Sequence, residues 1–263
     1  MKSLTQADIQ TVQSYWNARP CNIRHTSQPI GTREYFDEVE KRKYFVEAHI
    51  PGFAQFERWN GKKVLEVGCG IGTDTINFAR AGALVTAVDL SDESLKLAKQ
   101  RAKLFSLEEK ISFYQANAEE LSSQVPMDSY DLVYSFGVIH HTPNPSNAIA
   151  QIKQYMTRSS EFRLMLYAKN SWKNIMIQAG FDQPEAQSGC PIAFTYTKDE
   201  VRNLLEGFEV SDIRQDHIFP FVVEKYVKYE YEIVPWFSSM PKDMFTALEK
   251  SLGWHMLITA RLG

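Results

Sequence analysis

The sequence is poor in cysteine, which argues against both a disulfide framework and a zinc site made of cysteines. Its three cysteines, Cys21, Cys69 and Cys190, are odd in number, widely spaced and free of any Cys-x-x-Cys pattern. A disulfide framework needs paired cysteines, and a zinc site of the cysteine type needs closely spaced ones, so we expect neither. We also expect no bound metal. Unpaired thiols fit a reducing compartment, and the sequence therefore predicts a cytoplasmic protein.

Long apolar runs and an excess of basic residues are also missing. No stretch approaches the ~18 apolar residues of a membrane-spanning helix. The N-terminal segment MKSLTQADIQTVQSYW has no apolar core, so we expect no secretory signal either. The 29 Lys and Arg residues are balanced by 32 Asp and Glu, which leaves a net charge of −3. Because nucleic-acid-binding proteins usually carry a basic excess, this balance disfavours a nucleic-acid partner.

The 263 residues contain no internal repeat and no flexible linker, so we expect a single structural domain with additions. Residues 1–60 are predicted to form an N-terminal helical cap. A short helix is expected from Asp8 to Trp16. Thr32 is predicted to cap a second helix, from Arg33 to about His49. We interpret the basic run at 41–43 as a solvent-exposed face of that second helix.

Residues 61–263 are predicted to form the main domain, because short apolar strands and helices alternate along its first half. The expected strands cover residues 63–67, 84–89, 111–115, 130–136 and 162–168, and the expected helices cover residues 73–80, 91–105 and 143–156. Such alternation is typical of a parallel sheet covered by helices on both faces.

After residue 168 the alternation becomes less regular. Residues 169–196 are predicted to be a loop-rich insertion with one short helix, after which Thr197 can cap another helix. Two further strands are expected over 208–213 and 254–260. The aromatic-rich stretch 220–237 can belong to the core, to a pocket or to a dimer surface, and the sequence leaves these alternatives open.

The most informative segment runs Val-Leu-Glu-Val-Gly-Cys-Gly-Ile-Gly from position 64 to position 72. Glycines at the carboxyl end of a first strand let a ligand approach the backbone, and open α/β sheets bind ligands there. Asp89 ends the second strand, where a carboxylate can accept hydrogen bonds from both hydroxyls of a ribose. A dinucleotide site requires Gly-x-Gly-x-x-Gly, but position 73 is Thr. Because Glu66 beside the loop would repel a pyrophosphate and attract a cation, the pattern favours a positively charged nucleoside.

Four segments, LEVGCGIGT, AVDLS, NAEEL and YDLVYSFGVIHHTPNP, resemble in order and spacing those of the class I S-adenosylmethionine-dependent methyltransferases. The resemblance covers roughly residues 60–168. It implies a Rossmann-like α/β fold with a seven-stranded, mostly parallel sheet, helices on both faces and an antiparallel last strand. It also implies S-adenosyl-L-methionine as the cofactor and S-adenosyl-L-homocysteine as the product.

The resemblance assigns the first cofactor contacts to the glycine-rich loop. The backbone at Gly68, Gly70 and Gly72 would lie along the methionine part of the cofactor. Glu66 would help to hold its amino end, directly or through water. Without the other motifs, glycines in this position would be equally consistent with a simple turn.

The remaining cofactor contacts implied by the resemblance follow the second, third and fourth strands. Asp89 would accept hydrogen bonds from the ribose hydroxyls, and Leu90 would pack on the adenine. Asn117 stands where the family usually has Asp, near the adenine amino group, and Ala118 would contribute backbone. Ser135, at the end of the fourth strand, would lie near the methionine carboxylate or the sulfonium.

Two adjacent histidines follow the fourth strand and are the candidates for a general base. The pKa of histidine suits proton removal near neutral pH. In the resembling family a histidine often stands second in such a pair, which favours His141 over His140. The alternative is that both rings have packing roles. Adjacent side chains usually point apart, so we expect no metal between them.

The methyl acceptor is predicted to bind between the N-terminal helices and the segment after the fifth strand. The aromatic and cationic side chains of these regions suit a small organic acid, a phenol or a peptide terminus. The candidate substrate-binding residues are Tyr15, Trp16, Arg19, His25, Arg33, Tyr167, Lys169, Trp172 and His217.

Together these features predict a methyltransferase that uses S-adenosylmethionine and acts on an oxygen, or a nitrogen, of a small molecule or small peptide. We expect a monomer or homodimer with no nucleic-acid or membrane partner. Two alternatives remain open. One is a non-catalytic module that binds S-adenosylmethionine and serves a partner protein, and the other is a NAD(P)-dependent oxidoreductase.

Overall fold

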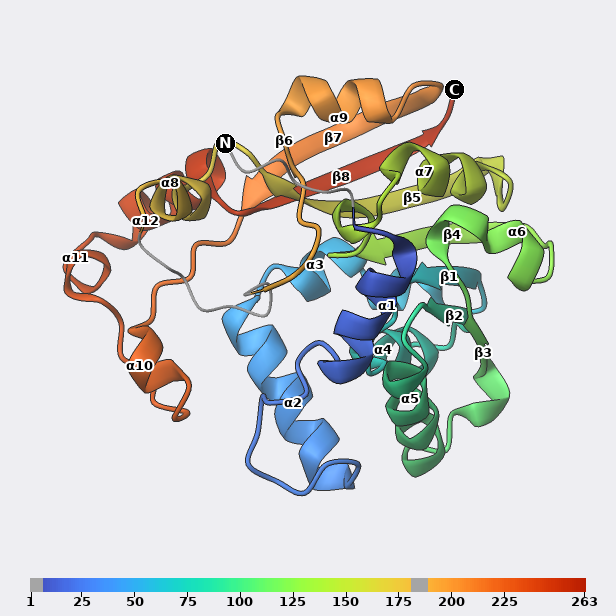
Figure 1. The fold of residues 1–263 in the computed structure, drawn as a ribbon, viewed down its shortest axis with the longest axis horizontal. Coiled ribbons are helices and arrows are strands. Elements are labelled where there is room, and N and C mark those ends of the chain that lie inside the picture. The colour runs from blue at the N-terminus through green and yellow to red at the C-terminus, as the bar shows by residue number, and fades with distance from the viewer. Residues whose placement is uncertain (1–6, 181–188) are drawn as a thin grey trace.

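The computed structural model describes residues 7–180 and 189–263, and its centre is a single twisted sheet (Figure 1). The strands follow the order β3-β2-β1-β4-β5-β8-β7, and the two-residue β6 pairs with β5. Their bounds are β1 Lys63–Val67, β2 Leu84–Asp89, β3 Ile111–Gln115, β4 Tyr130–Phe136, β5 Met156–Ala168, β6 Thr195–Tyr196, β7 Phe208–Asp216 and β8 His255–Leu262. β8 is antiparallel to both of its neighbours, and the pairs among β1 to β6 are parallel. The predicted α/β class and mostly parallel sheet are therefore confirmed.

Helices cover both faces of this sheet. Their bounds are α1 Ile9–Ala18, α2 Arg33–Val46, α3 Ile50–Ala54, α4 Thr73–Arg80, α5 Asp92–Leu104, α6 Leu121–Gln124, α7 Pro145–Lys153, α8 Trp172–Gln178, α9 Lys198–Leu204, α10 Val223–Tyr226, α11 Pro235–Ser238 and α12 Lys242–Leu252. In the part of the chain that the structure describes, none of these helices combines the length and apolar character needed to cross a bilayer.

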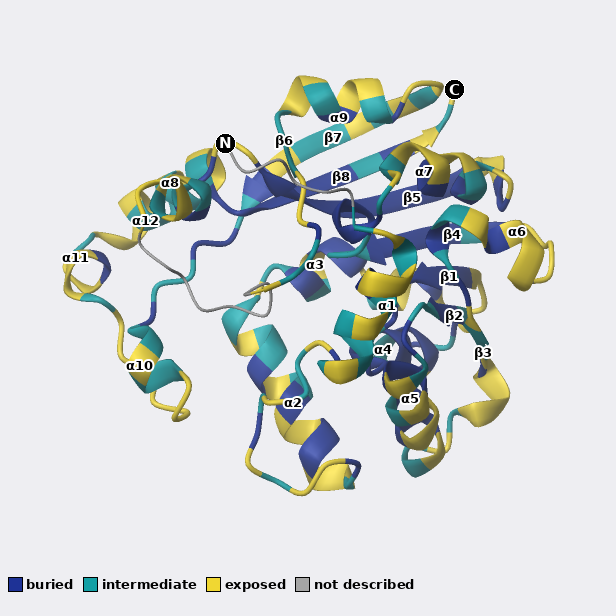
Figure 2. Ribbon diagram, in the orientation of Figure 1, coloured by how far each residue is buried: buried dark blue, intermediate teal, exposed yellow. Residues whose placement is uncertain are grey.

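Alternating side chains along each strand build one core on each side of the sheet. In β1, Leu65 and Val67 join the core beneath α7 and α9, whereas Val64 joins the core beneath α3, α4 and α5. A strand buried on both faces is apolar at nearly every position, which is why β1, β4 and β5 are dark blue along most of their length in Figure 2. Both faces of the central strands are therefore covered, and a ligand can reach these strands only at their ends.

Local capping chemistry begins the helices where the sequence predicts. The hydroxyl of Thr32 accepts a hydrogen bond from the N–H of Tyr35 at the start of α2, and Thr197 forms a capping box with Glu200 at the start of α9. The predicted caps at these two positions are confirmed. The far end of α2 differs from the prediction, because the helix stops at Val46.

The interpretation of the basic run at 41–43 as a solvent-exposed face is wrong for two of its three residues. Arg42 is buried, with its guanidinium 4.0 Å from the ring centroid of Tyr226 and a 2.7 Å hydrogen bond to the Tyr226 carbonyl. Lys43 turns toward the sheet, and its Nζ lies 2.8 Å from Asp74. The reason is that α2 lies between the main body and the aromatic-rich stretch 220–237, so two sides of the helix are covered. Lys41 alone of the three is exposed.

One fully buried arginine joins α2 to the main body. Arg101 of α5 donates to Glu40 of α2 at 2.7 Å, to the hydroxyl of Thr73 of α4 at 2.7 Å and to the carbonyl of Phe36 at 3.2 Å. A buried guanidinium is tolerated only when it is paired and hydrogen-bonded, and its planar fork can reach several acceptors at once. Arg101 therefore connects three helices that are distant in sequence.

Replacing Arg101 with Met should destabilise the chain by about 3 kcal/mol, the lower end of the range for breaking a buried ion pair. The lower end is expected because Glu40 keeps a second partner, Arg80, at 2.6 Å. Urea unfolding followed by circular dichroism measures the change. Replacing the exposed Lys99 of the same helix with Met is the matched control and should change stability by less than about 0.5 kcal/mol. Equal stabilities of the two variants would contradict the assigned role.

Candidate active site

A cavity opens at the carboxyl ends of β1, β2 and β4, where the loops after these strands meet residues of α1 and α2. Open α/β sheets bind ligands in this position because the strand order reverses there. Seven of the predicted cofactor-binding residues line the cavity: Glu66, Gly68, Gly70, Asp89, Leu90, Asn117 and Ala118. From the predicted catalytic and substrate-binding sets, His141 and Trp16 also line it.

The three glycines of the glycine-rich turn share a positive φ but differ in what surrounds them. All three residues have positive φ, +85° at Gly68, +53° at Gly70 and +78° at Gly72. A Cβ at Gly68 would lie 2.1 Å from Val138, and one at Gly72 would lie 3.1 Å from the Cβ of Ala98 in α5. At Gly70 a Cβ would meet no atom within 4 Å. The first and third glycines therefore allow close packing, and the second leaves open space at the cavity wall.

Asp89 connects the glycine turn to the end of β2. One carboxylate oxygen accepts from the N–H of Gly70 at 2.7 Å, and the other accepts from the N–H of Ser91 at 2.8 Å. Burial raises the pKa of Asp89, and the backbone hydrogen bonds from Ser91 and Gly70 lower it. Each carboxylate oxygen keeps a further lone pair, so the group can still accept a pair of hydroxyl donors from the cavity.

Two predicted cofactor residues have local structural partners. Asn117 lines the cavity, but its side-chain oxygen already accepts from the N–H of Glu119 at 3.0 Å. Ser135 is completely buried, and its hydroxyl donates to the carbonyl of Val67 at 3.0 Å. Neither Ser135 nor Gly72 is among the described residues that line the cavity. Both therefore support the loops from behind.

Two acidic side chains lie close together at the floor of the cavity. Glu66 accepts a 2.5 Å hydrogen bond from Thr75, while Asp74 accepts from Tyr44 at 2.9 Å and from Tyr134 at 3.0 Å. Burial, together with the neighbouring Asp74 carboxylate, raises the pKa of Glu66 to about 8. The Lys43 ammonium, 2.8 Å from Asp74, already balances one negative charge, so the site gains a net charge of −1 that favours a cation only when Glu66 is ionised.

His141 presents a neutral imidazole to the cavity in a defined tautomer. Its Nδ1 lies 2.6 Å from the carbonyl oxygen of Ile192. Because a carbonyl only accepts hydrogen bonds, Nδ1 holds the proton and Nε2 keeps its lone pair. Burial lowers the pKa of His141 to about 4. The ring can thus accept a proton or a hydrogen bond at neutral pH.

His140 lies behind His141 and is fully buried. Its ring centroid is 3.8 Å from that of Tyr167, and neither of its nitrogens has a hydrogen-bond partner among the described residues. Burial lowers the pKa of His140 well below its usual value. It does not line the cavity, so the geometry separates the two histidines into a cavity residue and a packing residue.

The N-terminal helix α1 lies against the loop that follows β2. Gln13 donates to the carbonyl of Leu90 at 3.0 Å, and the Ser91 hydroxyl lies 3.4 Å from the carbonyl of Trp16. The Trp16 ring meets the His141 ring edge-on, with 5.3 Å between centroids. Trp16 therefore forms an aromatic wall beside the imidazole.

The other eight substrate-binding candidates are not among the described residues that line the cavity: Tyr15, Arg19, His25, Arg33, Tyr167, Lys169, Trp172 and His217. Arg33 donates to the carbonyl of Leu104 at 2.8 Å. Lys169 pairs with Glu200 at 2.7 Å. Tyr167 stacks on Trp254 within the core. The positions of these side chains depend on packing contacts that the sequence pattern does not contain.

Two charged residues at the cavity are missed by the sequence analysis. Lys43 lines it from α2, and Asp74 lines it from the first turn of α4. Asp74 comes two residues after Gly72 of the glycine-rich loop, so its place in the sequence could have indicated that it lies at the cavity. Lys43 had no signal of its own, because it belongs to a run of charged residues on a polar helix.

A family model described as "Methyltransferase domain" matches residues 59–208. Among curated proteins, the chain resembles the ubiquinone biosynthesis O-methyltransferase of Aromatoleum aromaticum, with 33% identity over 117 residues, 41% of this chain and 49% of that protein. The protein of the same name from Hydrogenovibrio crunogenus is 28% identical over 152 residues, 56% of this chain and 58% of that protein. The chain thus spans about half the length of the curated relatives it matches.

Solved structures extend the likeness of the fold to nearly the whole chain. The magnesium protoporphyrin IX methyltransferase from Synechocystis PCC 6803, solved with bound SAH, superposes with a TM-score of 0.63 at 17% identity. That superposition covers 97% of this chain and all of the other. An S-adenosylmethionine-dependent methyltransferase from Mesorhizobium loti gives 0.55 at 17% identity, over 81% and 97% of the two chains. The matched fold therefore includes the N-terminal helices and the last strands.

The tautomer and pKa of His141 lead to a spectroscopic prediction. Its imidazole should stay neutral with the proton on Nδ1 from pH 8 down to about pH 5, and titrate near pH 4. Nitrogen-15 NMR of histidine-labelled protein, with His141→Gln for assignment, measures both properties. A resonance that titrates near 6.5 would contradict the buried geometry.

The same shift makes stability depend on pH. As pH falls through about 6.5, the unfolded chain binds a proton at this position before the folded chain does, so stability is lost between about pH 6.5 and 4. In His141→Gln, that part of the loss should be absent from urea unfolding curves recorded across this range.

Proposed function

The chain belongs to the methyltransferase domain family, and from this premise we propose that it transfers a methyl group from S-adenosylmethionine to an oxygen of a small organic molecule, with nitrogen as the second choice of acceptor atom. One observation carries the proposal. The glycine-rich turn, the Asp89 carboxylate and the His141 imidazole line the same cavity. The residues expected to bind the nucleoside and a neutral imidazole that can act as a base therefore line the same cavity.

The residues of the cavity fit this cofactor in shape and in charge. Gly70 leaves room for a ligand against the backbone, and the spare lone pairs of Asp89 suit the two ribose hydroxyls. Asp74 is paired with Lys43, and Glu66, which is largely protonated in the free protein at pH 7, would supply negative charge by ionising when a sulfonium or an ammonium binds. When bound, S-adenosylmethionine supplies the activated methyl group, so the protein mainly has to orient the acceptor and exclude water.

His141 favours an oxygen acceptor. Its Nε2 can accept the hydrogen of a hydroxyl that enters the cavity, while the Ile192 carbonyl holds the ring in place through Nδ1. With a pKa of about 4 the imidazole is a weak base. It therefore suits an acidic hydroxyl, such as a phenol or an enol, better than an aliphatic alcohol or an ammonium group.

The walls of the cavity and the relatives support an aromatic acceptor. Trp16 and Phe136 both line the cavity and give it aromatic surface on which a planar ring can pack. The curated relatives are named as O-methyltransferases of ubiquinone biosynthesis, although this chain matches only about half of their length. We therefore propose a small phenolic or enolic compound as the acceptor class.

Both alternatives are less well supported by the cavity. A silent binding module would not require an imidazole with a free lone pair beside the ligand space. A NAD(P)-dependent enzyme would require a third glycine at position 73, where the chain has a buried Thr whose hydroxyl accepts from Arg101. Titration with S-adenosylhomocysteine and with NAD separates the proposal from the NAD(P)-dependent alternative, and a turnover assay separates it from the silent module.

Replacing Asp89 with Asn should weaken binding of S-adenosylhomocysteine roughly 10- to 100-fold, equivalent to about 1.5–3 kcal/mol for hydrogen bonds to a charged group. Isothermal titration calorimetry on wild type and variant measures this. Asp92→Asn, at a partly exposed acid three residues later, is the matched control and should bind like wild type.

Two results would overturn the assignment of this cavity as an S-adenosylmethionine site. One is wild-type protein that binds NAD but not S-adenosylhomocysteine, because the turn would then be a dinucleotide site. The other is an Asp89→Asn variant with wild-type affinity, because the ribose would then lie elsewhere. Automethylation or turnover of S-adenosylmethionine with cell extract would separate an enzyme from a silent module.

The raised pKa of Glu66 predicts proton release on binding. At pH 7 the carboxyl is largely protonated in the free protein, since burial and Asp74 raise its pKa to about 8. A sulfonium nearby would favour the ionised form, so S-adenosylmethionine should release more protons than S-adenosylhomocysteine. Calorimetry in buffers of different ionisation enthalpy measures the difference. It should vanish in Glu66→Gln, and equal proton release for the two ligands in wild type would contradict the position of the acid.

A further inference from the structure

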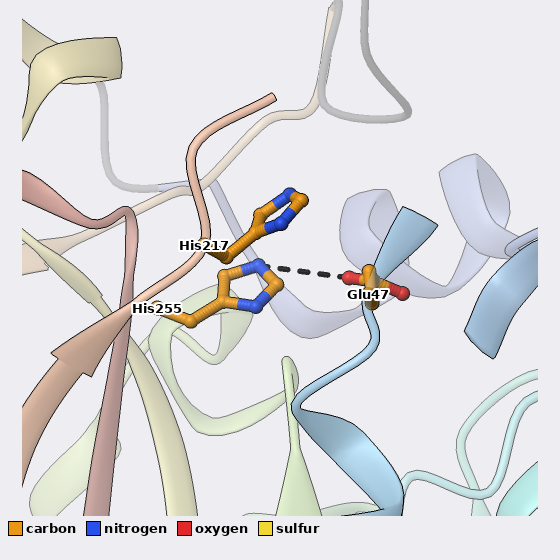
Figure 3. Close-up of side chains that lie close together, drawn as sticks. All are labelled: Glu47, His217 and His255. Atoms are coloured by element: carbon orange, nitrogen blue, oxygen red, sulfur yellow. Dashed lines mark ion pairs between the residues drawn. The ribbon is translucent and has the colours of Figure 1, made fainter. Parts of the chain in front are cut away.

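Behind the cavity, three side chains from distant parts of the sequence meet at the same edge of the sheet. Glu47 directly follows α2, His217 follows β7, and His255 begins β8 (Figure 3). One potential ligand atom from each, two imidazole nitrogens and a carboxylate oxygen, lie within 4.8 Å of one another. His217 and His255 are buried, and Glu47 is partly buried. No step of the proposed methyl transfer uses these residues.

We propose that Glu47, His217 and His255 bind one divalent transition-metal ion of the zinc class. Two histidines and one glutamate are a known donor set for zinc sites that keep a position open for water or another ligand. The same combination suits iron(II). The binding is independent of the proposed methyl transfer, because none of the three residues lines the cofactor cavity.

The spacing of the three ligand atoms is close to that of a metal site. His255 Nε2 lies 3.7 Å from a carboxylate oxygen of Glu47, the contact drawn as a dashed line in Figure 3. In a tetrahedral zinc site with ligand distances of about 2.0–2.1 Å, neighbouring ligand atoms are about 3.3–3.4 Å apart. The ligand atoms, which lie within 4.8 Å of one another, would have to move closer together when a metal binds.

Hydrogen bonding from behind orients His255 as a ligand. Its Nδ1 lies 3.0 Å from Nε2 of His49, and Nδ1 of His49 lies 4.0 Å from a carboxylate oxygen of Asp216. If His255 donates its Nδ1–H to Nε2 of His49, its own Nε2 is left unprotonated and can bind a metal, whereas the 4.0 Å between His49 and Asp216 is too long for a hydrogen bond. Carboxylate and histidine partners of this kind are typical of the outer shell of metal sites.

The backbone at His217 is a second, independent observation. Its φ is +72°, which is unusual for a residue that is not glycine. The position is fixed on both sides, because the His217 N–H donates to the Asp216 side chain at 2.8 Å and its carbonyl accepts from Trp254 at 2.8 Å. Its ring centroid lies 4.6 Å from that of His255. Strain of this type concentrates at functional sites.

The local charges allow a cation at this position. Glu47 is acidic and lies 3.7 Å from His255, and Asp216 is a second carboxylate 4.0 Å from His49. Lys173 opposes them, with its ammonium 5.4 Å from the ring centroid of Trp254. Lys43 and Arg214 also act on this region, so the attraction for a divalent ion has to come from direct ligation by Glu47 and the two imidazoles.

Untagged protein should be dialysed against a chelator and titrated with Co²⁺ as a spectroscopic probe, then with Zn²⁺ in competition with a chromogenic chelator. Wild type should bind one equivalent and give the visible absorption of four- or five-coordinate Co²⁺. Glu47→Gln and His217→Gln should each weaken Zn²⁺ binding by at least about 100-fold. His49→Gln should weaken it about 10- to 100-fold, as is usual for outer-shell partners.

His25→Gln replaces a histidine outside the cluster and should leave metal affinity unchanged. Unfolding midpoints of the metal-free proteins show whether a variant is folded, and Zn²⁺ should raise the midpoint of wild type but not of Glu47→Gln. Wild type that binds no Co²⁺ or Zn²⁺ at micromolar concentration would overturn the proposal, as would folded Glu47 and His217 variants that bind like wild type. S-adenosylhomocysteine titrated with and without Zn²⁺ tests the methyltransferase proposal separately.

Discussion

The buried guanidinium of Arg101 is the contact on which both functional regions depend. It holds α2 against α4 and α5 through Glu40 and Thr73. One turn beyond Glu40 on α2, Lys43 reaches the cavity, and four residues later Glu47 reaches the histidine cluster. A helix detached from the main body would remove a charged wall from the first site and an acidic side chain from the second. This buried ion pair, together with the apolar face of α2, thus helps to position two sets of polar groups.

Five of the six histidines of this chain lie in one continuous group of ring contacts at the edge of the sheet, and His25 is the sixth. Tyr167 joins the two halves of the group, with its ring centroid 3.8 Å from His140 and 6.3 Å from His255. Burial keeps the rings neutral, so they can pack like aromatic side chains while still offering nitrogen lone pairs. One half of the group faces the cavity through His141, and the other half forms the proposed metal site.

Phe136 separates these two regions. It lines the cavity, and its ring centroid is 5.4 Å from that of His255. Charges still act across this boundary, because Lys43 lowers and Asp74 raises the pKa of His49. The raised pKa of Glu66 and the lowered pKa of His255 both come mainly from burial. The two regions are therefore separate in space but not electrostatically independent.

The sequence by itself determined the parts of the protein that depend on neighbours along the chain. Alternating strands and helices, the caps at Thr32 and Thr197, the glycine-rich turn and the acid that ends β2 follow from local sterics and hydrogen bonding, and these predicted a parallel sheet covered by helices, while the resemblance of four segments implied the methyltransferase fold. Only the tertiary structure decided which histidine faces the cavity, that Lys43 is turned inward, and that Glu47, His217 and His255 meet. These outcomes depend on how α2 and the last strands pack across the sheet. Such packing is set by contacts between residues far apart in sequence, for which no local pattern exists.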